Sequence, residues 1–264
     1  MPQQLNIHII GGCMLGQKAL GLSNLFYRKY TAQLQQAFGL QATVRLDGHN
    51  DFDTLPSKAE NITPVPGVPQ VLIIQLRPGL IFRRCNLLVP AKKKGLFPFQ
   101  WNPYITGASS GVSSSAEMNL SDQEMGAVHM TGKLQKMLAT INALAGMLAG
   151  FHRKGSRQIA DLLIQTADRC TQQHIQLLVI GCVNSYQNKL ISIQYKAVNK
   201  LLRQYLQQKG IHYIDVFPAM EAKKAAGELL FLEDNYHLST AGHAVLAEEL
   251  YRASSKTVHA LTSL

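Results

Sequence analysis

The sequence predicts an α/β protein in which helices cover both faces of a parallel β-sheet of about five strands. Short apolar runs rich in β-branched residues alternate with longer helical stretches, and this alternation is typical of a parallel sheet that is buried on both faces. The chain is 46% hydrophobic and 16% charged, which is ordinary for a globular protein and unlike a disordered one. We therefore expect a single domain, residues 1–264, in three α/β/α layers.

Five apolar runs predict the strands, and they lie at residues 5–10, 42–46, 71–76, 175–180 and 211–216. Four stretches predict helices: residues 16–38, residues 127–170 with a break near Gly155, residues 188–209 and residues 240–254. Ser239 or Thr240 is the expected N-cap of the last helix, because hydroxyl side chains satisfy the first free N–H groups of a helix.

Residues 77–125 fit this scheme poorly. Prolines occur at positions 78, 90, 98 and 103, and residues 109–115 are almost entirely serine and glycine. Such residues mark turns and loops. We expect an irregular insertion at about 77–125 that lies over the site.

A net charge of +10 suggests an acidic partner. The densest basic cluster lies within residues 82–101, where Arg83, Arg84 and three lysines at 92–94 are interleaved with apolar side chains. This segment predicts a docking surface for an acidic carrier protein or another anionic surface. A solvated loop with some core contacts is an equally good interpretation. No nucleic acid is expected as a partner, because the chain has no recognisable nucleic-acid-binding motif.

We expect a cytoplasmic protein that uses no cofactor. The first predicted strand begins almost at the N-terminus without a leader pattern, and no apolar run approaches the ~20 residues that a membrane span needs. The four cysteines, at positions 13, 85, 170 and 182, are scattered without metal-ligand spacing. They are interpreted as free thiols.

Asp234 and His237 form an Asp-x-x-His pattern just before the last predicted helix. At this spacing the carboxylate can hold the imidazole while the other ring nitrogen faces a nucleophile. A surface turn that leads into a helix cap is the alternative, and for an isolated pattern of this kind it is the more common one.

A candidate nucleophile lies at the other end of the chain. The first predicted strand ends in Gly11 and Gly12, and Cys13 follows where a helix is expected to begin. Glycines permit a tight turn, and a helix N-terminus favours a thiolate. Ligand sites of open parallel sheets lie at the carboxyl ends of the strands, where this turn must be. A small buried cysteine behind a glycine turn is the alternative.

These two ends resemble the first and last blocks of the SGNH (GDSL-like) hydrolase superfamily. The last block of that family is Asp-x-x-His, commonly followed by Leu-Ser and Gly-His, and residues 234–243 read DNYHLSTAGH. The first block is Gly-Asp-Ser-Leu, and residues 11–14 read GGCM. The resemblance spans almost the whole chain and implies a flavodoxin-like three-layer sandwich.

The resemblance also implies roles for individual residues. His237 would be the general base and Asp234 its orienting partner. Gly48 falls where the second block has a glycine whose backbone N–H binds the oxyanion. Cys13 replaces the serine nucleophile, which is chemically permissible because a cysteine paired with a histidine is a strong nucleophile.

The third block, Gly-x-Asn-Asp after strand three, is absent, and residues 75–79 read QLRPG. Loss of an oxyanion donor costs ~10²–10³ in rate unless another donor replaces it. Arg77 is the first candidate replacement. Asn50 is the second, although a role as a turn residue is favoured for it.

We therefore expect an ester or thioester hydrolase, or an acyltransferase, that forms a thioester acyl-enzyme on Cys13. The main alternative is a noncatalytic binding protein that kept the fold and lost the activity.

Overall fold

The computed structural model describes residues 3–12, 15, 17, 20–49, 51–90, 99–101, 133–183, 189–233 and 237–262. Its centre is a five-stranded sheet in the order β2-β1-β3-β6-β7, in which every neighbouring pair is parallel. The strands are β1 (Gln4–Gly11), β2 (Gln41–Gly48), β3 (Gln70–Gln75), β6 (Ile175–Ile180) and β7 (His212–Ile214). The predicted fold class is thereby confirmed.

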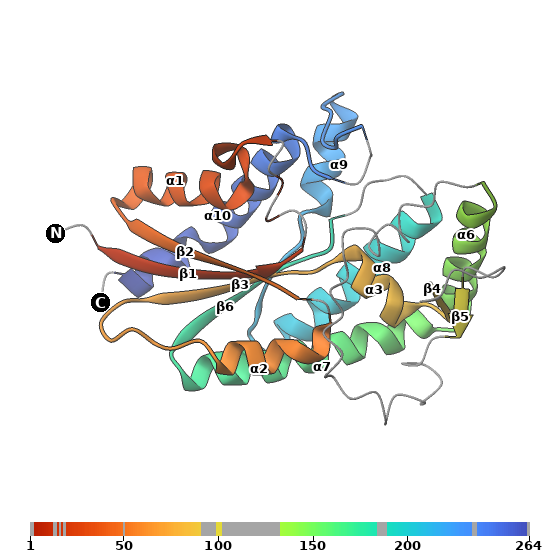
Figure 1. The fold of residues 1–264 in the computed structure, drawn as a ribbon, viewed down its shortest axis with the longest axis horizontal. Helices are drawn as coiled ribbons and strands as arrows, with labels where there is room; N and C mark the ends of the chain where they lie inside the picture. The colour runs from red at the N-terminus through yellow and green to blue at the C-terminus, as the bar shows by residue number, and fades with distance from the viewer. Residues whose placement is uncertain are drawn as a thin grey trace.

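Helices cover both faces of the sheet, and each face has its own hydrophobic core (Figure 1). One core packs under α1 (Phe26–Phe38), α9 (Phe217–Ala225) and α10 (Thr240–Thr262). The other packs against α2 (Leu55–Glu60), α3 (Pro78–Cys85), α6 (Lys133–Leu148), α7 (Phe151–Gln172) and α8 (Lys189–Gln207). Short 3-10 helices at Leu22–Asn24 and Phe52–Thr54, and an antiparallel pair of β4 (Leu88–Pro90) and β5 (Phe99–Trp101), complete the described elements.

Burial follows the position of each strand in the sheet. All six residues of β3 are buried, because this central strand is covered on both faces, and its sequence is accordingly an apolar run flanked by glutamines. β2 forms an edge of the sheet, and half-buried residues alternate with exposed ones over its first half. Because these strands are parallel, the carboxyl ends of β1, β2 and β3 lie side by side. We call this end of the sheet its carboxyl edge, and the loops that follow the three strands begin there.

The break in the long helical stretch lies at Ala149–Gly150 and not near Gly155. Gly150 has φ +75 and separates α6 from α7. Gly155 lies inside α7, and a Cβ there would be 2.4 Å from the carbonyl oxygen of Arg84. That glycine is required by the close approach of α3 to α7 and does not end a helix.

Other helix boundaries also differ from the sequence prediction. α1 begins at Phe26, ten residues after the predicted start, α10 continues to Thr262, and α2 and α9 were not predicted. The beginning of the predicted insertion at 77–125 is regular, because Pro78 occupies the first turn of α3, where a missing N–H costs nothing.

Four residues of the predicted docking segment at 82–101 are buried and not at the surface: Phe82, Arg84, Cys85 and Asn86. Phe82 is buried in the core. Arg84 is buried and its Nη2 contacts carboxylate oxygens of Asp51, at 2.8 Å, and Asp53, at 2.6 Å. Residues 91–98, which include the three lysines, lie outside the described residues. Within the described ranges, no helix is both long enough and apolar enough to cross a membrane.

Candidate active site at the carboxyl edge of the sheet

Gly11 and Gly12 lie at the end of β1 among close neighbours. A Cβ on Gly12 would be 2.8 Å from Nε of Arg77, and a Cβ on Gly11 would be 3.0 Å from Oε1 of Gln75. Both distances are at or below the limit of real Cβ contacts. The glycines thus allow side chains from the end of β3 to lie against the backbone just before position 13.

Arg77 links the ends of three strands. It is buried, and its carbonyl oxygen accepts the first hydrogen bonds of α3 from Leu80 and Ile81. Its Nη1 donates to the carbonyl oxygen of His49, the residue that follows β2. The guanidinium therefore lies beside Gly12.

His49 is a buried imidazole that the sequence analysis did not single out. Its backbone N–H donates to the carbonyl oxygen of Gly11 at 3.2 Å, and Nδ1 lies 3.4 Å from the same oxygen. Burial, together with the positive charge of Arg77, lowers the pKa of His49 to about 3. His49 is therefore neutral at pH 7, with Nδ1 as the protonated nitrogen. Nε2 finds no hydrogen-bond partner among the described residues.

Gly48 is the last residue of β2 and pairs in register with Gly11. It is exposed, and a Cβ at this position would meet no atom within 4 Å. The space beside it is therefore open to a ligand, and its partner Gly11 precedes Cys13 by two positions in the sequence.

His237 lies in a bend just before α10. Its carbonyl oxygen accepts from Leu232 N–H at 2.8 Å, and its side chain is half-buried. Ser239 is the N-cap of α10, because its Oγ accepts from Gly242 N–H at 3.2 Å, which confirms the predicted cap. Leu230 packs so closely that a Cβ on Gly242 would be 2.2 Å from the Leu230 carbonyl oxygen.

Gln17 joins the two ends of the chain at this edge. Its Nε2 donates to the carbonyl oxygen of Leu238 at 3.2 Å, and its Oε1 lies 2.5 Å from Nε2 of His243. Nδ1 of His243 accepts from Phe26 N–H at 3.2 Å, so Nε2 carries the proton and donates it to Gln17. Burial lowers the pKa of His243 to about 4 and keeps this ring neutral. The segment after position 13 is thus fastened to the residue that follows His237.

Three predicted site residues, Cys13, Asn50 and Asp234, lie outside the described residues. Of the others, Arg77 lies beside Gly12, and Gly48 lies beside Gly11. His237 directly precedes Leu238, whose carbonyl oxygen accepts a hydrogen bond from Gln17. Within the described ranges, no three His, Cys, Asp or Glu side chains gather in a way that could hold a metal ion.

Sequence reasoning missed Gln17 and His49. The Gly-His pair at 242–243 was noted as part of the last motif, but its histidine binds Gln17 and has a structural role. A signal for His49 was present in its position directly after the glycine of β2.

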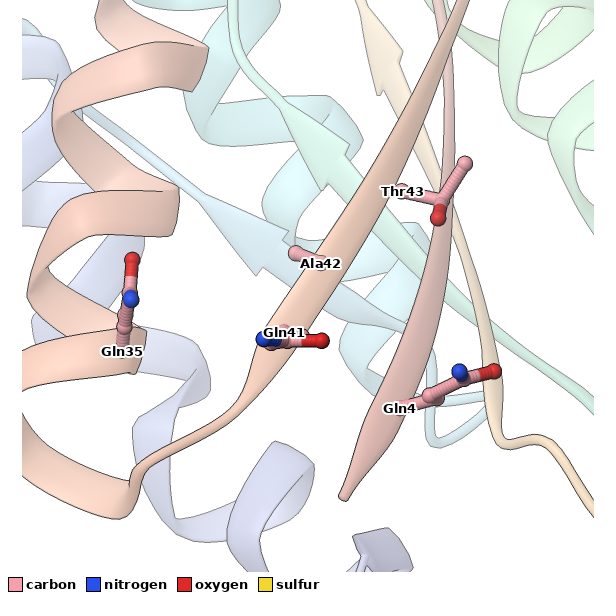
Figure 2. A pocket seen from close by; sticks show the side chains of 5 residues that line it. All are labelled: Gln4, Gln35, Gln41, Ala42 and Thr43. Carbon is pink, nitrogen blue, oxygen red and sulfur yellow. The ribbon is translucent and has the colours of Figure 1, made fainter. Parts of the chain in front are cut away.

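A polar hollow of about 370 Å³ lies at the opposite edge of the sheet (Figure 2). It is lined by Gln4 of β1, Gln35 of α1 and the first residues of β2, Gln41, Ala42 and Thr43. Gln4 and residues 41–43 lie at the amino ends of their strands, so this hollow is separate from the candidate active site.

The sequence matches no protein-family model, and a search of curated proteins finds no relative. Solved structures are similar over nearly the full length. A lipolytic protein of the G-D-S-L family from Veillonella parvula has 10% identity and a TM-score of 0.52, with 96% of this chain and 99% of that chain covered. A catalytic mutant of an acetylxylan esterase from Geobacillus stearothermophilus has 11% identity and a TM-score of 0.55, with 96% of each chain covered.

A lipase from a goat rumen metagenome has 10% identity and a TM-score of 0.54, with 95% of this chain and 97% of that chain covered. At such low identity the similarity concerns the arrangement of the backbone. The chain therefore has the three-layer α/β/α fold seen in a G-D-S-L lipolytic protein, an acetylxylan esterase and a lipase.

Proposed function

We propose that this chain is an ester or thioester hydrolase of the SGNH type in which Cys13 is the nucleophile. The hydrogen bond from Gln17 to the carbonyl oxygen of Leu238 carries the proposal, because Gln17 follows Cys13 by four positions in the sequence and Leu238 directly follows His237. The names of the similar structures, which are lipolytic and esterase proteins, favour acyl chemistry.

In the proposed reaction, Sγ of Cys13 attacks the substrate carbonyl carbon while His237 accepts the thiol proton. The new C–S bond forms, the bond to the leaving alkoxide or thiolate breaks, and His237 returns the proton to that leaving group. Water then attacks the thioester carbonyl carbon and gives a proton to His237. The C–S bond breaks, His237 returns the proton to Sγ of Cys13, and the acid is released. Asp234 orients the imidazole of His237. If an alcohol replaces water in the second half, the same site is an acyltransferase.

Backbone N–H groups of Cys13 and Gly48 are the proposed oxyanion donors. The open space beside Gly48 supports this role. Arg77 is the proposed third donor or the anchor of an anionic substrate group. Its guanidinium lies beside Gly12 at the end of β1, which supports this role.

The test is intact mass spectrometry after incubation with a panel of activated acyl esters and acyl thioesters. We expect a covalent acyl adduct on the wild type that maps to the peptide containing Cys13. Cys13→Ala should form no adduct, and His237→Ala should form it much more slowly. Cys170→Ala is the matched control, because that thiol is buried on α7, and its adduct should equal that of the wild type.

An adduct that persists in Cys13→Ala would show that another residue is the nucleophile. No adduct with any member of the panel, together with reversible binding of one of them, would favour the noncatalytic binding protein.

A further inference from the structure

Helix α6 carries an exposed apolar stripe. Its members are Met137, Ile141, Leu144 and Leu148, which are 53%, 54%, 43% and 82% exposed. Their spacing of four, three and four residues puts them on one side of the helix. They are four of the nine large apolar side chains exposed in the described ranges, so the exposure is concentrated on a single helix.

The opposite side of α6 provides its contact with the protein. Ala139, Ala143 and Gly146 are buried there, and a Cβ on Gly146 would be 2.9 Å from the carbonyl oxygen of Cys85. Oδ1 of Asn142 accepts from Leu88 N–H, and its Nδ2 donates to the Leu88 carbonyl oxygen. The apolar stripe therefore faces away from the core to which the helix is fixed.

The charged residues nearest to this stripe in the sequence are basic. Residues 133–160 contain five lysines and arginines and no aspartate or glutamate. Among them, Arg153 and Lys154 are exposed in the first turn of α7, directly after the Gly150 turn that follows the stripe. Arg157, one turn further on, is paired with Asp161.

We propose that the stripe of α6 and the first turn of α7 bind the surface of an anionic phospholipid bilayer. The helix would lie in the plane of the interface, with its apolar side chains among the acyl chains and Arg153 and Lys154 at the lipid phosphates. Sixteen residues give a helix roughly 24 Å long, enough to bury the whole stripe in one orientation.

Charge complementarity selects this occupant over a second copy of the chain. A dimer through α6 would bring the basic residues of two copies close together, whereas anionic lipid attracts them. α6 also lies at the end of the molecule toward which the parallel strands point (Figure 1), so a bound bilayer would face the same end as the candidate active site. This membrane binding goes beyond the proposed acyl chemistry and does not depend on it.

The test is co-sedimentation with vesicles of pure phosphatidylcholine and of an equimolar mixture with phosphatidylglycerol. We expect the wild type to bind the anionic vesicles more tightly. Ile141→Gln with Leu148→Gln should lower the partition coefficient about tenfold or more. Arg153→Gln with Lys154→Gln should lower it about fivefold or more, and this loss should disappear at high salt.

The matched control is Leu22→Gln with Val65→Gln. These apolar side chains are 61% and 46% exposed but lie outside α6, so partition should equal that of the wild type. Thermal unfolding checks that each variant is folded, because all of these side chains are at the surface. Three outcomes would overturn the proposal: the wild type fails to sediment with anionic vesicles, the control pair loses as much binding as the α6 pair, or light scattering shows a wild-type dimer that the α6 pair dissociates.

Discussion

The four cysteines should differ sharply in reactivity if Cys13 is the nucleophile. Cys85, Cys170 and Cys182 are free and buried. Burial raises the pKa of Cys85 and of Cys170 to about 12, and it raises the pKa of Cys182 well above its ordinary value. The structure thus supplies three internal references for a thiol that is not activated.

The size of the difference follows from ionisation. A thiol of pKa about 12 is a thiolate to the order of one part in 10⁵ at pH 7, whereas an ordinary pKa of about 8.5 gives a few per cent. Cys13 should therefore be alkylated at least ~10³ times faster than Cys85 or Cys170, even with no activation. Pairing with His237 should lower the pKa of Cys13 further and extend its rapid reaction to pH 6.

The assay is iodoacetamide labelling between pH 6 and 9.5, with peptide mapping to assign the rate of each cysteine. His237→Ala should slow the alkylation of Cys13 about tenfold or more near pH 6.5 and leave it unchanged at the highest pH, where the thiol is ionised in both proteins. His212→Ala, which removes an exposed imidazole on β7, is the matched control and should change nothing. Cys13 among the slowest cysteines, or an unchanged pH profile in His237→Ala, would refute the nucleophile and its pairing.

Three further predictions test the surroundings of the site. Arg77→Ala should lower kcat by ~10² or more with little change in KM if the guanidinium is an oxyanion donor, and should mainly raise KM if it anchors the substrate; unchanged constants would remove it from the site. Gly242→Ala should lower the thermal midpoint, because its Cβ would be 2.2 Å from the Leu230 carbonyl oxygen, and an unchanged midpoint would contradict that contact. The pKa of His243 is lowered to about 4 in the folded protein, whereas an unfolded histidine has a pKa of about 6.5. The unfolded state therefore takes up a proton on this ring at higher pH than the folded state does, and the free energy of unfolding should fall as pH drops from about 6.5 to 4. His243→Gln should reduce that slope by about 1.4 kcal/mol per pH unit, as measured by urea unfolding, and an identical slope would show that the buried ring is protonated in the native state.

Local patterns in the sequence determined the sheet and the N-cap of α10. The apolar run of β3 indicated a strand covered on both faces, and all of its residues are buried. Ser239 was readable as a helix cap because capping depends on neighbours three residues away. The alternation of strands and helices was sufficient to predict the fold class. Helices place apolar side chains on one face with a period of 3.6 residues and strands with a period of 2, so the two kinds of element differ in the sequence.

Tertiary structure decided which glycine separates two helices and which cation is buried. Gly150 and Gly155 are equal candidates in the sequence, but Gly150 adopts the left-handed conformation, while Gly155 allows α3 to approach α7. Arg84 belongs to a basic, apolar segment that suggested a surface, but two carboxylates from the loop after β2 pair with it and compensate its burial.

The contact between the loop after β1 and helix α10 also depended on the tertiary structure. Gln17 is an ordinary glutamine in the sequence, and its partner His243 lies 226 positions away. Propensity and periodicity describe interactions within a few turns of chain, so they predicted a reactive turn at each end but not the hydrogen bonds that fasten those turns together. The exposure of the α6 stripe likewise depended on packing, because an apolar helix has the same sequence pattern whether or not a neighbouring element covers its second side.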